Sequence, residues 1–171
     1  MQEFVTYGWW IFAIRWLHVL SGVMWIGLLW YFNFVQTPSM PKIPEAQRGA
    51  VTGFIAPTAL FWFRWGAMST IVTGLIVAYM SGFLGGAIKL GIGDHDPHTT
   101  SIGFGMWLGT IMWFNVWFLI WPNQKKVLGI VPSEPDERRK AGRIAGLASR
   151  TNTMLSIPML YAMVSAGRPF F

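Results

Sequence analysis

The chain has 171 residues, of which 53% are hydrophobic and only 12% are charged, whereas about 25% charged residues is typical of a soluble domain. A soluble core of this size cannot bury so much apolar surface, so the composition excludes a water-soluble globular protein. The net charge of +6 lies mostly in short connections between apolar segments, which indicates a topology signal and contact with anionic lipid rather than nucleic-acid binding. Because the chain has no cysteine, iron–sulfur clusters, disulfides and covalent c-type haem are excluded within it.

Four apolar segments are long enough to cross a bilayer, which takes about 20 residues. We expect transmembrane helices over residues 9–35, 56–83, 102–121 and 144–166, each bound being approximate. The connections between them are short and polar, so consecutive helices should be antiparallel neighbours. The sequence therefore predicts one all-α integral membrane domain over residues 1–171, an antiparallel bundle of four transmembrane helices.

Basic residues predict the orientation of this bundle. The first and third connections hold eight of them: Lys42, Arg48, Lys125, Lys126, Arg138, Arg139, Lys140 and Arg143. The opposite side has only Lys89 and Arg168. Basic residues in short loops mark the cytoplasmic side, so we expect a multi-pass protein of the bacterial inner membrane with both termini periplasmic.

The first predicted helix has the densest set of residues that could carry chemistry. Arg15, His18, Gly22 and Trp25 follow one another at spacings of three, four and three, which places them on one helix face. Ionisable groups are costly in lipid, so this face should point into the protein. A neutral imidazole there is a favoured axial ligand of haem iron; Arg15 could pair with a propionate, and Gly22 would leave a slot for a flat ring. The alternative is that His18 is a hydrogen-bonding group between helices and Gly22 marks close packing.

A second iron ligand has several candidates. No other histidine falls in a predicted span, which leaves Met80, Met106 or Met163, a His18 from a second copy of the chain, or a five-coordinate iron. A methionine ligand would raise the haem potential. Each methionine could instead simply fill the core.

A second polar group is expected near the cytoplasmic side. Arg64, Asn115, Arg150 and Asn152, with Ser156 beside them, come at comparable depths on three predicted helices, so they could form one hydrogen-bonded network. One interpretation is that they hold helices together while the arginines reach towards water. The other is a pocket for an anionic substrate or a quinone head group.

The connection between the second and third helices contains Asp94-His95-Asp96-Pro97-His98. These residue types bind divalent metals, but their spacing matches no strong metal-site signature. A solvated turn, or a docking surface for a periplasmic partner, is the favoured interpretation.

Three regions together form a recognisable pattern: residues 15–22 with 25–27 and 30–36, residues 114–117 with 120–124, and residues 149–153 with 156–160. This pattern resembles the urate oxidase N-terminal domain family, the membrane part of bacterial membrane-bound urate hydroxylases. The histidine followed by Trp-x-Gly in the first helix also resembles the haem-containing protoporphyrinogen oxidases of bacterial membranes. The positions that match the first family are Arg15, His18, Trp25, Asn115, Asn123, Arg150 and Asn152.

The resemblance implies a membrane protein tied to redox chemistry. In full-length family members a cytochrome c domain follows the membrane part, whereas this sequence ends at Phe171 without Cys-x-x-Cys-His, so we expect a short form whose electron acceptor is a separate protein.

We therefore predict an inner-membrane redox subunit that holds haem b through His18. Its expected partners are the lipid bilayer and a periplasmic cytochrome c or other subunits of a larger respiratory complex; a homo-oligomer is a further option. Two alternatives stay open. One is a cofactor-free structural or accessory subunit of a larger membrane complex, and the other is a urate hydroxylase-like oxidoreductase coupled to cytochrome c.

Overall fold

The computed structural model describes residues 6–93 and 96–167, and all regular structure in these residues is helical. Four long rods can be followed along the chain. The first rod comprises α1 (Tyr7–Trp30), the π-helix η1 (Tyr31–Gln36), α2 (Thr37–Ser39) and the 3-10 turn η2 (Met40–Lys42). The second comprises α3 (Glu45–Ala50), the π-helix η3 (Val51–Ile55) and α4 (Ala56–Met80). After the short α5 (Leu84–Ile88), the third comprises α6 (Pro97–Phe114), the π-helix η4 (Asn115–Ile120) and α7 (Trp121–Val127), and the fourth is α8 (Pro135–Ser165).

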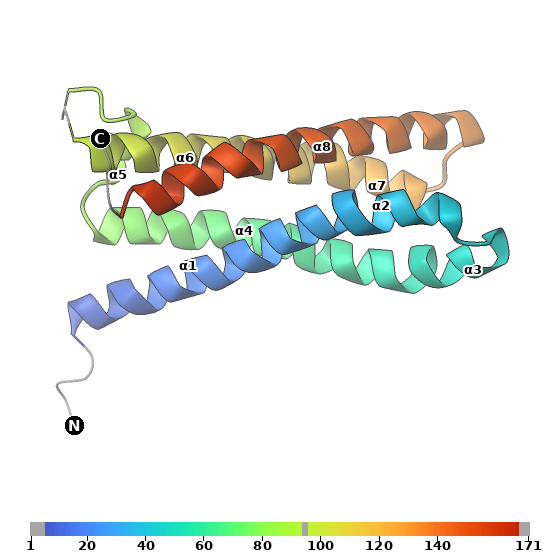
Figure 1. Ribbon diagram of the computed structural model, residues 1–171, viewed down its shortest axis with the longest axis horizontal. Helices are drawn as coiled ribbons and strands as arrows, with labels where there is room; N and C mark the ends of the chain where they lie inside the picture. Colours follow the sequence, from blue (N-terminus) through green and yellow to red (C-terminus); the bar gives the residue numbers. More distant parts are fainter. Residues whose placement is uncertain (1–5, 94–95, 168–171) are drawn as a thin grey trace.

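The rods lie side by side and alternate in direction (Figure 1). They pack mainly as two pairs. In one pair α1 packs against α4; in the other α8 packs against the third rod, which consists of α6, η4 and α7. The first three rods are long and apolar enough to cross a membrane, which confirms three of the predicted spans. The fourth rod is helical throughout the predicted range 144–166 but does not reach the same apolarity, so its crossing of the bilayer stays a prediction.

The rods are longer than the predicted spans, because helical structure continues into the predicted connections. The first rod continues to Lys42 and the second begins at Glu45, so only two residues connect them. Each of these rods has 36 residues, or about 54 Å at 1.5 Å per residue, against a hydrocarbon core of about 30 Å. Apolarity marks where lipid ends, whereas the helical backbone continues beyond that level.

The start of the fourth rod shows the same error. A loop was expected over residues 124–144, but α7 occupies its beginning and α8 starts at Pro135. Proline suits the first helical position because its missing N–H would have had no partner there. Asp136 and Glu137 in the first turn complement the helix dipole, and Arg139 pairs with Asp136.

Each of the three π-helices ends two residues before a proline, at Pro38, Pro57 and Pro122. The residue before each proline donates its N–H five residues back, as Thr37 does to the carbonyl of Phe32. A proline has no N–H, and its ring clashes with the carbonyl four residues earlier in an α-helix. The wider turn relieves both problems, so the rods pass through these prolines without breaking.

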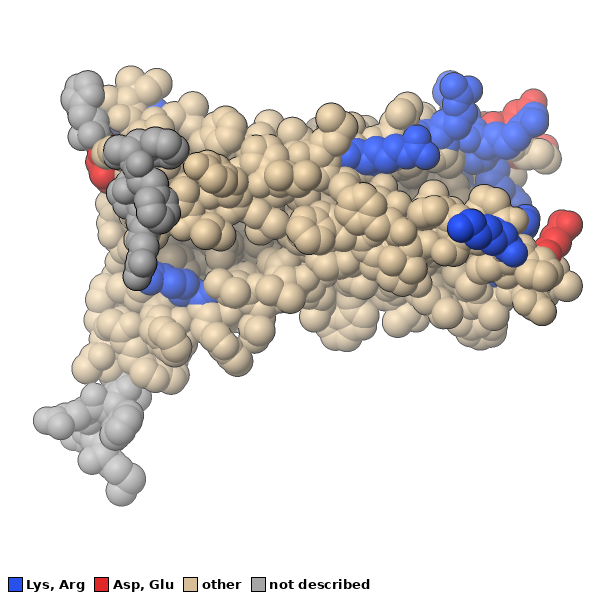
Figure 2. Space-filling view, in the orientation of Figure 1, with Lys and Arg blue, Asp and Glu red and all other residues tan. Residues whose placement is uncertain are grey.

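The core lies between the two pairs of rods and is dominated by Trp25, Leu29, Phe63, Met112 and Val116, all buried. Large apolar side chains on the outside of the rods are exposed, as lipid contact requires. Figure 2 shows most lysine and arginine side chains at one end of the rods, where the first rod connects to the second and the third to the fourth. The sides of the rods in this view are largely free of charge. The described part of the chain enters and leaves at the opposite end, where α1 begins and α8 finishes (Figure 1).

Candidate functional site

His18 is half-buried between α1 and α4, and contacts with α4 hold its imidazole ring. Its Nδ1 lies 2.9 Å from the carbonyl oxygen of Thr70 and 3.4 Å from the hydroxyl of Thr73. A β-carbon placed on Gly74 would lie 2.8 Å from Cε1 of His18, so only a glycine at this position allows the ring to lie against α4. Because a carbonyl can only accept, Nδ1 carries a proton in this arrangement, and in the neutral ring Nε2 then has the lone pair.

This geometry fits the histidine of a metal or haem site. Ligating histidines commonly donate their second ring N–H to a backbone carbonyl, which fixes the tautomer and the ring orientation. The predicted slot at Gly22 fits less well, because Gly22 faces Thr70, whose Cγ2 would lie 4.0 Å from a β-carbon at position 22. Gly22 therefore lies where α1 packs on α4, with room for a small side chain.

The remaining predicted haem residues are dispersed. Trp25 is buried in the core, 1% exposed, and its indole Nε1 has no hydrogen-bond partner within residues 6–93 and 96–167. Arg15 is exposed. Met106 on α6 and Met163, which packs over Gly105, belong to the other pair of rods, whereas Met80 lies on α4 itself. The structure thus brings His18 together with α4 but does not gather the proposed ligands around it.

The predicted polar network is partly present. Asn115 donates from Nδ2 to Oδ1 of Asn152 over 2.8 Å, and Asn152 donates to the carbonyl of Met112 over 2.9 Å. Asn152 is fully buried, so two interhelical hydrogen bonds satisfy its amide where water cannot. These contacts fasten α8 to the junction of α6 and η4.

Further polar contacts that the sequence analysis missed connect α8 to the first rod. The indole N–H of Trp30 donates to Ser156 over 3.0 Å, and Nδ2 of Asn33 donates to Ser149 over 2.7 Å. Asn33 also donates to the carbonyl of Leu29, one turn back. Asn33 is a polar residue inside a strongly apolar run, and this was the signal that could have identified it.

Arg64 is not part of the asparagine network, which corrects that expectation. Its guanidinium carbon lies 3.9 Å from the ring centroid of Trp121, 5.2 Å from that of Trp117 and 5.9 Å from that of Trp65. Its Nε is buried without a hydrogen-bond partner in the described parts of the chain. Three indole rings attract the cation through their π faces and replace the hydrogen-bond network as its local environment.

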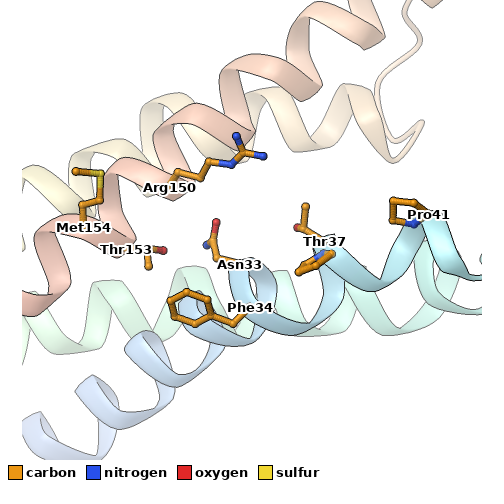
Figure 3. A pocket seen from close by; sticks show the side chains of 8 residues that line it. Asn33, Phe34, Thr37, Pro41, Arg150, Thr153 and Met154 are labelled. Atoms are coloured by element: carbon orange, nitrogen blue, oxygen red, sulfur yellow. The ribbon is translucent and has the colours of Figure 1, made fainter.

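Arg150 is exposed and lies apart from Asn115 and Asn152, at a crevice between the first rod and α8. The crevice has a volume of about 520 Å³ and is lined by Asn33, Phe34, Thr37, Pro38, Pro41, Arg150, Thr153 and Met154. Figure 3 shows the side chains of Asn33, Thr37, Arg150 and Thr153 around the same space, with Phe34 and Met154 at one side of it.

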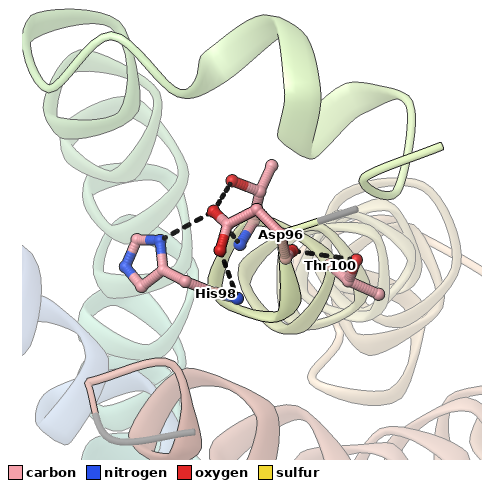
Figure 4. A network of polar contacts seen from close by, with 4 residues as sticks. Asp96, His98 and Thr100 are labelled. Atoms are coloured by element: carbon pink, nitrogen blue, oxygen red, sulfur yellow. Dashed lines mark hydrogen bonds and ion pairs between the residues drawn. The ribbon is translucent and has the colours of Figure 1, made fainter. Parts of the chain in front are cut away.

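The acidic turn before α6 contains a helix cap. Oδ2 of Asp96 accepts from the hydroxyl of Thr99 over 2.6 Å, and the backbone N–H groups of His98 and Thr99 donate to the same carboxylate (Figure 4). The hydroxyl of Thr99 lowers the pKa of Asp96 most, and the two backbone donors act in the same direction. Asp94 and His95 lie outside the described residues, and no group of three metal-binding side chains occurs among those described. Asp96 therefore has a structural role at the start of α6.

The family model described as Urate oxidase N-terminal matches residues 95–171. The match confirms the resemblance for residues 95–171, the part of the chain that contains the third and fourth rods with Asn115, Asn123, Arg150 and Asn152. Arg15, His18 and Trp25 lie outside the matched range. No curated protein and no solved structure matches the chain. These findings indicate a multi-pass membrane protein whose residues 95–171 are similar to the urate oxidase N-terminal family.

Proposed function

We propose that the chain is a redox subunit of the bacterial inner membrane, related to urate hydroxylases, that holds haem b through Nε2 of His18. The observation that carries this proposal is the contact of Nδ1 with the carbonyl of Thr70 over 2.9 Å. That contact leaves Nε2 as a free lone pair in a fixed orientation, which is what an axial iron ligand needs. A bound haem would supply one-electron redox chemistry.

The surrounding residues have distinct roles in this proposal. The carbonyl of Thr70 fixes the tautomer of the imidazole with the proton on Nδ1, and Gly74 gives the ring room against α4. Arg15 is exposed on the same helix, one turn before His18, and pairs with a propionate. A second ligand to the haem would come from Met80 on α4, from Met106 if the two pairs of rods approached more closely, or from His18 of a second copy.

The proposed arrangement in the membrane has four spans, with α8 as the fourth and both ends of the chain in the periplasm. Its support is the gathering of basic side chains at one end of the rods (Figure 2). His18 then lies in the periplasmic half of the membrane, because it is near the start of α1. A periplasmic cytochrome c or a neighbouring subunit of a respiratory complex is the electron acceptor.

The optical spectrum of detergent-purified protein tests this function. We expect a Soret band that is lost in His18→Ala and kept in His98→Ala, which removes a histidine at the start of α6. Gly74→Ala should shift or weaken the band, because the added methyl group displaces the imidazole. A folded, lipid-containing wild-type protein without a Soret band would overturn the haem proposal.

Two other functions have specific support. The buried contacts of Asn152 and Ser156 fit a cofactor-free accessory subunit whose task is to present a rigid surface to neighbouring subunits. The match over residues 95–171 favours a urate hydroxylase-like oxidoreductase. Urate-dependent reduction of added cytochrome c by purified protein would establish urate-oxidising activity. If a haem-loaded preparation showed no such reduction, electron transfer without urate oxidation would be the remaining redox function.

A further inference from the structure

The crevice between the first rod and α8 has one charged residue in its lining, Arg150. Among the described residues, no carboxylate lies within 4.0 Å of this guanidinium, since the ion pairs there involve His98, Lys126 and Arg139. Arg64 on the second rod, by contrast, lies against tryptophan rings. Arg150 is therefore a cation that is free to bind an anion from outside the chain.

The polar wall of the crevice is held in place by other contacts. Asn33 is fixed by hydrogen bonds to Leu29 and Ser149, and the hydroxyl of Thr153 donates to the carbonyl of Ser149 over 3.1 Å. An inner cavity of about 270 Å³ shares Asn33, Thr37 and Arg150 with the crevice. Because these polar groups are already held in place around one cation, ligand binding would cost little conformational entropy at the site.

An apolar strip leads away from Arg150 towards the middle of the rods. From Arg150, spacings of four, three and four residues lead to Met154, Ile157 and Tyr161 on the same face of α8. These three side chains are 73%, 65% and 62% exposed. Phe34 lies across the crevice on the first rod and is also exposed (Figure 3). The surface thus combines a cation at one level with apolar side chains at the levels below it.

We propose that this crevice binds one anionic phospholipid, with its phosphate on Arg150 and an acyl chain along Met154, Ile157 and Tyr161. The planar guanidinium can donate two parallel N–H groups to phosphate oxygens. The apolar strip favours a lipid over a free phosphate ion, since a free ion would leave the strip uncovered. A zwitterionic lipid is disfavoured, because its own ammonium group offsets the phosphate charge. The proposal is independent of haem binding.

Native mass spectrometry and thermal unfolding in detergent test the site with three additions: phosphatidylglycerol, phosphatidylcholine and inorganic phosphate. We expect phosphatidylglycerol adducts and a raised unfolding temperature in wild-type protein, and neither effect at equal concentrations of the other two. Arg150→Gln should weaken phosphatidylglycerol binding about five- to tenfold, as expected for one interfacial cation. Arg138→Gln, with the same charge change on α8 outside the crevice, should bind as wild type.

Two further variants separate the parts of the site. Arg150→Lys should retain most of the binding, because it keeps the charge, whereas Ile157→Asn should weaken lipid binding without removing the cation. Equal binding by Arg150→Gln and wild type would overturn the proposal. Equal protection by inorganic phosphate would show a free-anion site instead, and equal protection by phosphatidylcholine would show that the charge of the lipid has no part in it.

Discussion

Replacing Asn152 by alanine should destabilise the protein by about 1–3 kcal/mol. Asn152 is fully buried and makes two hydrogen bonds between helices, to Asn115 and to the carbonyl of Met112. Hydrogen bonds between transmembrane helices average about 0.6 kcal/mol and reach about 1.7 kcal/mol in measured cases. Two such bonds, with the space left by the lost amide, give the stated range.

The assay is reversible unfolding in detergent, carried out as a double-mutant cycle with Asn115→Ala. The coupling energy between the two positions should be about 0.6–1.7 kcal/mol, because each single substitution removes the same bond. Asn123→Ala is the matched control: its amide donates only to the carbonyl of Leu119 in its own helix, so its cost should stay below about 0.5 kcal/mol. A coupling energy of zero, or equal costs at 123 and 152, would refute the reasoning.

Two further predictions concern the packing of α6 at Gly103 and the helix cap at Asp96. Gly103→Ala should lower the free energy of unfolding by about 1–3 kcal/mol, because the new methyl group meets the backbone carbonyl of Ala87. Gly109→Ala is the control: its methyl group enters open space, so stability should stay unchanged or rise by up to about 1 kcal/mol. Asp96→Ala should lower the unfolding temperature at neutral pH. The folded-state pKa of Asp96 is lowered, so its stabilisation is present above the ordinary value near 3.8 and is lost as pH falls through the folded value. The gap between wild type and Asp96→Ala should therefore narrow below about pH 4, and a constant gap down to pH 2 would count against the cap.

The three apolar rods could be predicted because hydropathy reports directly on contact with lipid. Their true ends could not, since helices continue into the polar region wherever the residues tolerate it: the first rod extends to Lys42, the second begins at Glu45, and α8 begins at Pro135. The predicted first and third spans ended shortly before Pro38 and Pro122, whereas a wider turn before each of these prolines lets the helix pass.

The candidate site was predictable where depth alone decides contact. Asn115 and Asn152 come at matching levels on antiparallel helices, and they bond. Arg64 has the same depth, but tryptophans on its own rod and the next one surround it. The contact of His18 with Thr70 depends on the register of α1 against α4, which a single sequence does not encode in any local pattern.

The π-helix before Pro38 has a consequence for how this protein tolerates change. A π turn holds one residue more than an α turn, so it rotates everything after it by about 100° around the helix axis. Deleting one residue within 31–36 would remove the extra residue together with the wider turn, so Thr37 would keep its place at the crevice, but Pro38 would lose the relief that this turn provides. Homologues with a single-residue gap in 31–36 should therefore keep the crevice residues in place, and they should have a residue other than proline at the position of Pro38.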